Sequence, residues 1–535
     1  MPVLLSSFSC LFLLSLSVST SASEDDAVVV TSSGPIKGKH LTVGSGSVTA
    51  FLGIPYAEPP LGKLRFQKPL PHQPWSHVLE ATSFGNSCSQ KKLIGLPEIE
   101  IWTPNNPLAE DCLFLNLWVP YPRPSTPAPI LVWIHGGGFI TGAASLDIYN
   151  GAFLAANENV IVASMNYRLG ALGFLYLPPD APGNVGLWDQ WLALKWVKEN
   201  AAAFGGDPDQ LTLLGHSAGA ASVGFHLLSS ASQPLFARAV LQSGAPNAPW
   251  AWKKPEEAKE DALRLSNSMG CANSNHSAIV SCLQGKQLEE NTFYVQSHIN
   301  SLTTDGAFLP DEPWKLLEHI HAKPLLTGIT ADEGSVFFMF INATEDYGTE
   351  SWKAILIGMM EDAVKSNGKA VVEAMALKYN NDSNEVARYR RAAAQFFGDY
   401  WFVCPMAEFA AKMAGTRSPV YAYTFTHRSN SSTWPEWMGI PHGAEVPYLF
   451  GTLARINQSY TEAEAALSRR VMGYWAEFAR TGNPTGSAAS ELQWPLYNAT
   501  EQNFFHINMD APQVTQLSPA PLCDFLATHL NATHE

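Results

Sequence analysis

The stretch Gly215-His216-Ser217-Ala218-Gly219 spells Gly-x-Ser-x-Gly between a run typical of a strand and a run typical of a helix. The preceding residues 211–214 are mostly apolar, and residues 218–228 are rich in Ala and Leu. A serine on such a tight turn projects its hydroxyl out of the fold, and flanking glycines relieve the crowding there. The pattern therefore predicts a strand–turn–helix unit in which Ser217 is a nucleophile.

Strand-like and helix-like segments alternate along the chain. Residues 186–204 fit a helix, because Leu187, Trp191 and Leu194 share one face and Gly205-Gly206 would end it. Apolar runs typical of buried strands occur at residues 130–134, 160–164, 211–214, 239–241, 325–329 and 420–425. This alternation predicts a large, mostly parallel central sheet flanked by helices. Together with the serine turn, it indicates an α/β-hydrolase fold in a single domain.

The composition favours one large folded unit and excludes some partners. The chain has 535 residues, of which 46% are hydrophobic and 15% charged, so a sizeable core can form. Lys and Arg number 33 against 48 Asp and Glu, which gives a formal net charge of −15. This acidic balance argues against nucleic acid or an anionic membrane surface as the main partner.

The N-terminal segment has the pattern of a secretory signal, although it lacks Lys and Arg. Residues 11–18 are Leu-rich, small residues follow, and an acidic run begins at Glu24. We expect residues 1–22 to be a signal peptide, residues 23–535 to form the hydrolase domain, and the protein to be secreted. No later stretch is long and apolar enough to span a bilayer, and the end of the sequence has no hydrophobic tail, so we expect no membrane anchor.

Cysteine and asparagine patterns agree with secretion. Of the seven cysteines, Cys10 lies in the signal segment, and the remaining six predict three disulfides. Six cysteines can pair in fifteen ways, of which sequential pairing is the simplest. The six are Cys88, Cys112, Cys271, Cys282, Cys404 and Cys523. Asn-x-Ser/Thr sequons predict glycosylated surface loops. They occur at Asn275, Asn342, Asn381, Asn430, Asn457, Asn498 and Asn531.

A glycine-rich loop follows the predicted strand at residues 130–134. In His135-Gly136-Gly137-Gly138-Phe139, successive glycines would let the backbone approach a substrate carbonyl closely. The N–H groups of Gly137, Gly138 and Ala218 could then stabilise the oxygen as it gains charge, as in an oxyanion hole. The alternative is a flexible glycine turn that forms no oxyanion hole. The Gly-x-Ser-x-Gly turn downstream argues against this alternative.

A nucleophilic serine needs a base, and the base needs an acid. His442 stands on a constrained loop between Pro441 and Gly443, and Glu333 follows the predicted strand at residues 325–329. The chain order Ser, Glu, His is the order of α/β-hydrolases. Spacing alone does not favour His442 over His427, or Glu333 over Asp332.

From about residue 28 to 526 the chain resembles the cholinesterase/carboxylesterase family, the type-B carboxylesterases. The matching stretches occur in the same order as in the family. The sequence at residues 242–247 and 434–439 is most similar to the cholinesterase branch. The matching stretches are residues 51–57, 110–116, 136–138, 181–186, 204–208, 215–224, 332–335 and 441–443.

The resemblance implies a role for each candidate residue. It assigns the nucleophile to Ser217, the acid to Glu333 and the base to His442, and it implies sequential disulfides. Ser243 resembles a buried serine near this triad, although a plain strand-end serine fits equally well. Glu445 resembles the buried glutamate that lies behind the base in the family.

Departures from the cholinesterase pattern concern the alcohol side of the site. The residue before the nucleophile is a glutamate in cholinesterases and is His216 here, which removes a negative charge and offers a group that can carry a positive one. Trp102 matches the tryptophan that holds choline by a cation–π contact, unless it only fills the core. The aromatic residue three positions after the acid is replaced by Val336. This cation-binding set is incomplete.

The acyl side also differs. The stretch from Cys282 to Asp305 is shorter than its cholinesterase counterpart and carries polar residues 296–300 where phenylalanines close the pocket in that family. We therefore expect a wider pocket that admits acyl groups larger than acetyl. Trp250 and Phe337 either line it or are core aromatics.

Our interpretation is a secreted serine carboxylic ester hydrolase that forms an acyl-enzyme on Ser217 and prefers neutral esters. One alternative is a true cholinesterase acting on choline esters, and another is a non-catalytic binding or adhesion relative. The reaction needs a small-molecule ester and no cofactor, and the sequence shows no metal-ligand cluster. A homodimer is left open.

Overall fold

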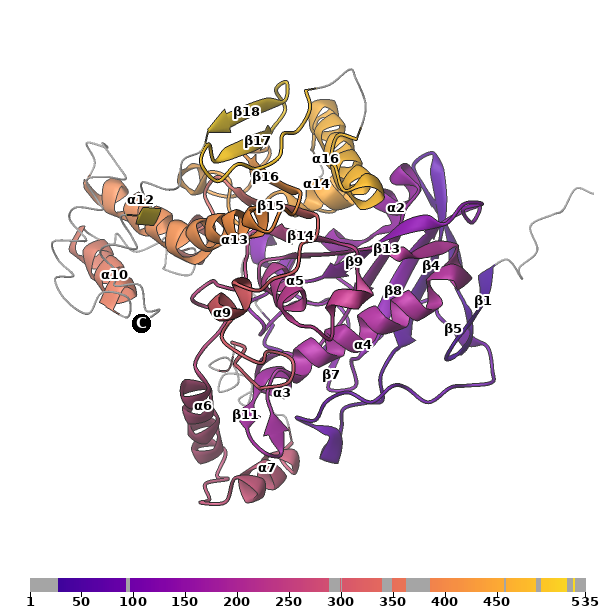
Figure 1. Cartoon of the computed structure of the whole chain (residues 1–535), viewed down its shortest axis with the longest axis vertical. Helices are drawn as coiled ribbons and strands as arrows, with labels where there is room; N and C mark the ends of the chain where they lie inside the picture. Colours follow the sequence, from indigo (N-terminus) through magenta and orange to yellow (C-terminus); the bar gives the residue numbers. More distant parts are fainter. Residues whose placement is uncertain are drawn as a thin grey trace, which may run out of the picture.

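A mixed sheet of 11 strands runs through the protein, in the order β18-β17-β16-β15-β14-β13-β9-β10-β8-β4-β3 (Figure 1). The structure is a computed structural model that describes residues 27–92, 97–287, 299, 301–338, 349–361, 385–456, 459–486, 492–516, 523 and 524. The strands of this sheet are β3 (Lys39–Val43), β4 (Gly46–Pro55), β8 (Phe114–Pro120), β9 (Ala128–Ile134), β10 (Ile161–Met165), β13 (Gly206–His216), β14 (Arg238–Gln242), β15 (Leu325–Thr330), β16 (Val420–Phe425), β17 (Asn503–Ile507) and β18 (Gln513–Gln516).

The middle of the sheet is parallel and its two ends are antiparallel. Neighbours from β10 through β9, β13, β14, β15 and β16 to β17 pair in parallel. Strands β8, β4 and β3 at one end and β18 at the other pair antiparallel. The prediction of an α/β-hydrolase fold with a mostly parallel sheet is confirmed, and every apolar run predicted as a strand lies in this sheet.

Helices cover both faces of the sheet, because alternate strand residues point to opposite sides. On β9, Ile130, Val132 and Ile134 belong to one buried cluster, whereas Leu131 and Trp133 belong to the other. The first cluster includes side chains of α4 (Val185–Asn200), α5 (Ala218–Leu228) and α13 (Cys404–Gly415). The second includes side chains of α2 (Ala152–Glu158), α14 (Val446–Phe450) and α16 (Glu462–Thr481).

Shorter elements surround these layers. The remaining helices are α1 (Pro97–Glu100), α3 (Gly170–Phe174), α6 (Pro255–Ser268), α7 (His276–Gln284), α9 (Pro313–Leu317), α10 (Thr349–Glu361), α12 (Glu385–Gly398) and α15 (Leu453–Ile456). Three small sheets are formed by β1 (Val28–Thr31) with β2 (Gly34–Lys37) and β5 (Leu79–Glu80), by β6 (Ser87–Cys88) with β7 (Leu108–Ala109), and by β11 (Tyr176–Leu177) with β12 (Ala181–Pro182). Among the described helices, none has the length and apolar character needed to cross a membrane.

Three disulfides join the six cysteines in sequence order. The pairs are Cys88–Cys112, Cys271–Cys282 and Cys404–Cys523, with Cα–Cα distances of 4.9, 5.7 and 5.5 Å. Sequential pairing is therefore confirmed. The predicted signal peptide at residues 1–22 lies outside the described residues.

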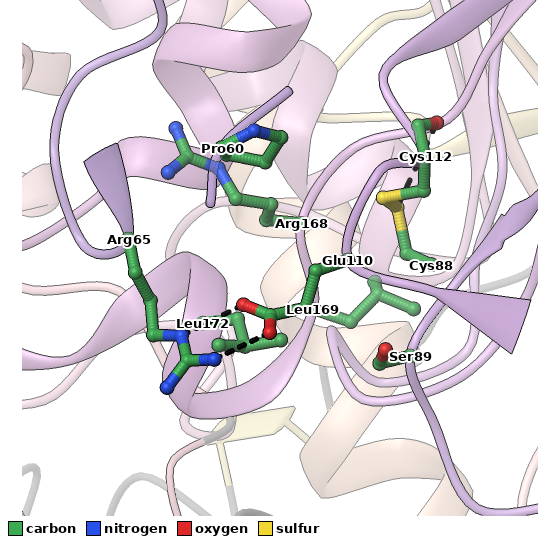
Figure 2. A pocket seen from close by; sticks show the side chains of 9 residues that line it. All are labelled: Pro60, Arg65, Cys88, Ser89, Glu110, Cys112, Arg168, Leu169 and Leu172. Carbon is green, nitrogen blue, oxygen red and sulfur yellow. Dashed lines mark hydrogen bonds and ion pairs between the residues drawn. A yellow bond between two sulfur atoms is a disulfide. The ribbon is translucent and has the colours of Figure 1, made fainter. Parts of the chain in front are cut away.

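The disulfide between Cys88 and Cys112 closes a loop, and an ion pair holds this loop in place. Figure 2 shows Arg65 and Glu110 beside this disulfide, around a cavity of about 10 Å³. Arg65 Nε donates to Glu110 Oε2 over 2.7 Å, and Arg65 Nη1 donates to the carbonyls of Leu283 and Lys286. A bidentate guanidinium–carboxylate contact of this kind fixes orientation as well as distance. The loop that carries Trp102 is thus tied to the body of the protein.

Candidate active site

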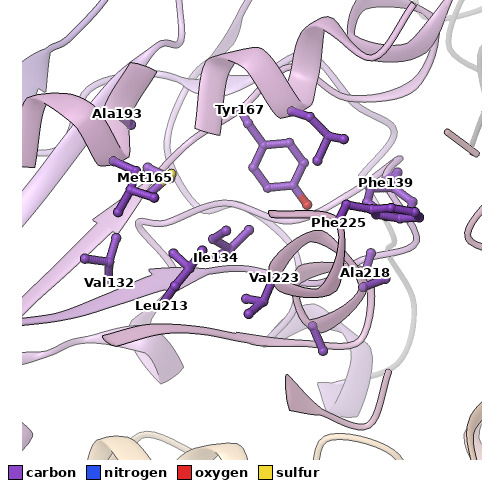
Figure 3. Packing of buried hydrophobic residues seen from close by; sticks show 14 of the residues in the cluster. Val132, Ile134, Phe139, Met165, Tyr167, Ala193, Leu213, Ala218, Val223 and Phe225 are labelled. Carbon is purple, nitrogen blue, oxygen red and sulfur yellow. The ribbon is translucent and has the colours of Figure 1, made fainter. Parts of the chain in front are cut away.

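The turn that carries Ser217 is strained in the way that the sequence predicts. β13 ends at His216, α5 begins at Ala218, and Ser217 between them has φ 57° and ψ −123°. A side chain at Gly219 would place its Cβ 2.0 Å from the carbonyl oxygen of Ile134, so only glycine fits there. Figure 3 shows apolar side chains of β9, β13 and α5 packed together, including Ile134, Leu213 and Ala218. Packing of both elements thus supports a backbone conformation that is costly for a non-glycine residue.

The glycine loop lies against the serine turn because β9 and β13 are neighbouring parallel strands. Ile134 pairs with Gly215, so both strands end at the same edge of the sheet. Gly137 and Gly138 adopt φ values of 111° and 59°, which favour glycine. A Cβ on Gly136 would lie 2.9 Å from Ser217 Cβ. The loop proposed as an oxyanion hole therefore reaches the proposed nucleophile.

Glu333 and His442 meet at the same edge. Glu333 follows β15 and is 2% exposed, and its Oε2 lies 2.5 Å from His442 Nδ1. Its other oxygen, Oε1, accepts hydrogen bonds from Ser243 Oγ at 2.6 Å and from the Thr330 N–H at 2.7 Å. His442 Nε2 is buried and has no hydrogen-bond partner among the described residues. The acid is thus fixed by three contacts, and the second nitrogen of the base is left for another group.

The other two candidates have different partners. His427 Nε2 lies 3.2 Å from Glu464 Oε1, near the start of α16. Asp332 Oδ2 accepts a hydrogen bond from the Ile440 N–H over 2.9 Å. Spacing alone did not decide between His442 and His427, or between Glu333 and Asp332. In the structure, Glu333 and His442 are the two that pair with each other.

Burial shifts the proton affinity of this pair. It lowers the pKa of His442, so the imidazole is neutral near pH 7 and able to accept a proton. Burial also raises the pKa of Glu333, while the hydrogen bonds from Ser243 and Thr330 oppose that rise. A base that is neutral and oriented by a carboxylate is what nucleophilic catalysis by serine requires.

Asp332 joins the loops that carry the acid and the base. Besides accepting from the Ile440 N–H, it donates its own N–H to the carbonyl of Ile440 over 3.0 Å. Ser335 Oγ donates to the carbonyl of Met438 over 2.8 Å, and Arg428 donates to the carbonyl of Gly439 over 2.6 Å. We call Asp332, Ser335 and Arg428 the loop clamp. It fixes the segment just before His442 from two sides.

One side of His442 is formed by His216 and Trp102. The ring centroids of His216 and His442 are 4.4 Å apart, and those of His216 and Trp102 are 6.2 Å apart with an interplanar angle of 28°. His216 is 4% exposed, and its Nε2 is buried without a hydrogen-bond partner among the described residues. Burial, and secondarily His442, lower the pKa of His216 well below its usual value. The sequence-based idea that His216 adds a positive charge is therefore not supported, because burial favours the neutral ring.

The other side of His442 is aromatic and apolar. Phe402 and Phe337 lie 4.6 and 5.6 Å from His442 between ring centroids, and they stack on each other at 5.5 Å. Trp250 lies 5.8 Å from Phe402 and 6.1 Å from Phe139, which ends the glycine loop. Phe337 is 38% exposed, and Val336 beside it is half-buried. Trp250 and Phe337 thus belong to one aromatic wall beside the base.

Phe402 is a site residue that the sequence reasoning missed. It lies on a π-helical turn, Asp399–Val403, between α12 and α13. No motif marks this turn, and the aromatic residues at 396, 397, 400, 401 and 402 are equally consistent with core packing. π-helical turns inside helices frequently occur at functional sites, but they have no simple sequence pattern.

Glu445 lies behind the base and is almost fully buried. Its Oε1 accepts from Gln242 Nε2 over 3.0 Å, and Trp475 Nε1 donates to Gln242 Oε1 over 3.1 Å. Burial, aided by the nearby Glu333, raises the pKa of Glu445 to about 7. The buried glutamate expected from the resemblance is thus held by Gln242 of β14, which is itself held by Trp475 of α16.

A cavity beside these loops does not include the serine. It has a volume of about 510 Å³ and is lined by Asp332, Glu333, Arg391, Glu436 and Trp437, among others, but by neither Ser217 nor His442. This cavity therefore does not mark the position of the predicted nucleophile and base.

Several predicted features are only partly covered by the structure. The polar residues in the stretch 296–300 lie outside the described residues, and only Ile299 of that stretch is described. Asn275, Asn430 and Asn498 are exposed, whereas Asn342, Asn381, Asn457 and Asn531 lie outside the described residues. Within the described ranges, no group of three or more His, Cys, Asp or Glu side chains is arranged to hold a metal ion.

Comparison with known proteins agrees with this geometry. The model of the carboxylesterase family matches residues 25–526. The chain belongs to the carboxylesterase family. An acetylcholinesterase of Bungarus fasciatus is 44% identical over 530 residues, covering 94% of this chain and 87% of the relative. A cholinesterase of Mus musculus is 42% identical over 537 residues, covering 96% and 89%. This carboxylesterase-family chain is therefore a carboxylic ester hydrolase.

Proposed function

We propose that the chain is a serine esterase that hydrolyses neutral carboxylic esters through an acyl-enzyme on Ser217. His442 Nε2 takes the proton of Ser217 as the hydroxyl attacks the ester carbonyl, and Glu333 orients the imidazole and stabilises its charged form. The N–H groups of Gly137, Gly138 and Ala218 stabilise the oxyanion. The alcohol leaves with the proton from His442, and a water activated by His442 then releases the acid. The supporting observation is the 2.5 Å contact between Glu333 and His442 Nδ1, which leaves Nε2 for proton transfer.

Preference for neutral esters follows from the environment of His216. A quaternary ammonium beside His442 would lose its hydration without gaining a carboxylate at position 216, since the residue there is a buried imidazole with a lowered pKa. Burying a charge without a paired countercharge is costly, so a neutral alcohol group fits this side better. The preference for acyl groups larger than acetyl rests on the short stretch between Cys282 and Asp305.

Choline ester hydrolysis is the second candidate. Trp102 presents a half-buried aromatic ring beside His216, and such a ring can hold a quaternary ammonium with a contribution of about 2 kcal/mol when desolvated. The names of the two relatives also favour this candidate.

Steady-state hydrolysis separates the two. The purified protein is assayed with a neutral butyrate ester, acetylthiocholine and butyrylthiocholine, with Ser217→Ala as control. We expect the neutral ester to have the highest kcat/KM and the control to be inactive. A higher kcat/KM for the thiocholines would favour the cholinesterase candidate. Absence of turnover for all three would favour the non-catalytic binding relative.

We also propose that the protein is secreted and glycosylated. Three disulfides and the exposed sequons at Asn275, Asn430 and Asn498 support this. Expression in a secretory cell line, with a gel-mobility shift on treatment with an N-glycosidase, tests it. Retention of the protein in the cytosol, or an unchanged mobility, would contradict it.

A further inference from the structure

The glycine loop after β9 is part of a turn that folds tightly on itself. The N–H of Thr141 donates to the carbonyl of Gly137 over 2.9 Å. Gly142 ends this turn with φ 105° and packs against its start, because a Cβ at Gly142 would lie 2.5 Å from the carbonyl oxygen of Gly136. The position of Gly142 therefore sets how the glycine loop is oriented.

The side chain of Gln90 binds both polar backbone groups of Gly142. The Gly142 N–H donates to Gln90 Oε1 over 2.7 Å, and Gln90 Nε2 donates to the Gly142 carbonyl over 2.8 Å. Gln90 is 3% exposed, and its Nε2 also donates to the carbonyl of Cys88 over 2.9 Å. A backbone N–H only donates and a carbonyl only accepts, so these contacts fix which way the side-chain amide points. Gln90 thus holds Gly142 by two hydrogen bonds in one orientation.

Gln90 belongs to the disulfide loop, residues 88–112. A second residue of this loop, Asn106, accepts a hydrogen bond from the hydroxyl of Ser145 over 3.2 Å. Ser145 is 3% exposed and lies three residues after Gly142. The disulfide loop therefore binds the segment just after the glycine loop at two points.

Orientation matters more at the glycine loop than at an ordinary turn. In the proposed reaction the N–H groups of Gly137 and Gly138 stabilise an oxygen that becomes charged only in the transition state. Such donors are effective only when they are already aimed at that oxygen. A side chain that fixes Gly142 therefore affects the rate of the chemical step more than the binding of the ester.

We propose that Gln90 is a positioning residue of the oxyanion hole, which holds the N–H groups of Gly137 and Gly138 in place through Gly142. This inference rests on the proposed esterase function and adds the disulfide loop to the parts of the protein that determine its rate. All esters share the carbonyl oxygen that these groups bind. The effect of Gln90 is therefore the same whatever the alcohol or acyl part.

The variant Gln90→Met tests this proposal, because it removes the hydrogen bonds and keeps a side chain of similar length. We expect kcat for ethyl butyrate and for phenyl butyrate to fall by the same factor, about tenfold, with KM changed by less than about twofold. Inhibition by butyl trifluoromethyl ketone should weaken by a similar factor. Ser217 adds to the ketone carbonyl, His442 takes the serine proton, and the resulting oxyanion lies on the same N–H groups.

The variant Asn200→Leu is the matched control for stability. Asn200 is also 3% exposed and also joins two distant segments, because its Oδ1 accepts from the Ser32 N–H over 2.7 Å and its Nδ2 donates to the Ser32 hydroxyl over 3.0 Å. We expect this variant to lower the unfolding midpoint without changing kcat, KM or the inhibition by the ketone. A merely structural role of Gln90 predicts that the two variants behave alike.

The outcomes separate this inference from the esterase proposal. If the wild type hydrolyses both esters and Gln90→Met matches it in kcat and in ketone inhibition, the inference is overturned while the esterase function stands. It is also overturned if only one ester is affected, if KM alone rises, or if Asn200→Leu shows the same loss of kcat. If the wild type hydrolyses neither ester, both proposals fail.

A second variant keeps the test decisive if Gln90→Met does not fold. The amide of Gln90→Asn is one methylene too short to reach both backbone groups of Gly142. This variant should also lower kcat and weaken ketone inhibition with little change in KM. Wild-type values in Gln90→Asn would overturn the inference.

Discussion

The two sides of His442 differ in chemistry although both touch the same ring. On one side, His216 brings a buried ring nitrogen without a partner, and Trp102 lies behind it on the disulfide-closed loop. On the other side, Phe402 and Phe337 stack on each other and present only carbon. A single base thus separates a side that can recognise polar groups from a side that can recognise only size and shape. We infer that alcohol selectivity and acyl selectivity can change independently in this protein.

If both sides of His442 serve one nucleophile, removal of that nucleophile should have the largest effect. Ser217→Ala should lower kcat/KM for every ester by about 10⁴-fold or more, since residual catalysis would come only from the oxyanion hole and binding. Steady-state kinetics with three esters of different alcohols measures this, with an unchanged unfolding midpoint as control. Retention of substantial activity toward any one ester would mean that a second nucleophile acts on it.

The loop clamp holds the loop that carries His442. Loosening it should therefore lower kcat/KM for all esters, whatever their alcohol or acyl part. Asp332→Ala removes the acceptor for the Ile440 N–H and should lower kcat/KM by about 100-fold through misplacement of the base. Asp332→Asn keeps an oxygen at this position and should restore most of that loss. Equal activity of Asp332→Ala and wild type would show that the base loop is held without this contact. If Asp332→Asn were as impaired as Asp332→Ala, the negative charge of Asp332 and not its acceptor oxygen would hold the loop.

The aromatic side should respond to a change of size alone. Phe402→Leu removes part of a ring that is 2% exposed and lies 4.6 Å from His442. We expect the ratio of kcat/KM for hexanoate over acetate esters of one alcohol to rise by about tenfold, because one or two methylenes are worth about this much in an apolar pocket. The ratio of kcat/KM for choline butyrate over 3,3-dimethylbutyl butyrate, which reports the alcohol side, should stay as in the wild type. A change in that second ratio would refute the independence of the two sides.

The smallest expected effect is on the acid limb of the pH profile. In the proposed reaction His442 must be neutral to accept the serine proton, and a lowered pKa keeps it neutral to lower pH. The fall of kcat/KM with acid should therefore have its midpoint below 6.5, the ordinary value for histidine. Measurement between about pH 3 and 8 locates it, since kcat/KM reports the free enzyme. A midpoint at or above 6.5 would show that the charge of Glu333 outweighs burial.

The sequence predicts one side of His442 better than the other, for a physical reason. Ser217, Gly137 and His216 belong to or adjoin short motifs whose backbone demands leave a local pattern of glycines. The parallel strands β9, β13 and β15 are continuous apolar runs, so the sheet edge that gathers these loops could also be predicted. Phe402 reaches His442 through a π-helical turn, which leaves no such pattern. The sequence did not predict the loop clamp either. Its side chains bond to backbone atoms that are distant in the sequence, as Asp332 does to Ile440.

The most direct test of our account is a pair of esters that differ only in charge. Choline butyrate and 3,3-dimethylbutyl butyrate have the same shape, and the second replaces the quaternary nitrogen by carbon. We predict that the wild type hydrolyses the uncharged ester with the higher kcat/KM. His216→Glu should raise the choline-over-dimethylbutyl ratio by about tenfold or more, since it supplies the missing countercharge. A wild-type preference for the choline ester, left unchanged by His216→Glu, would contradict the account.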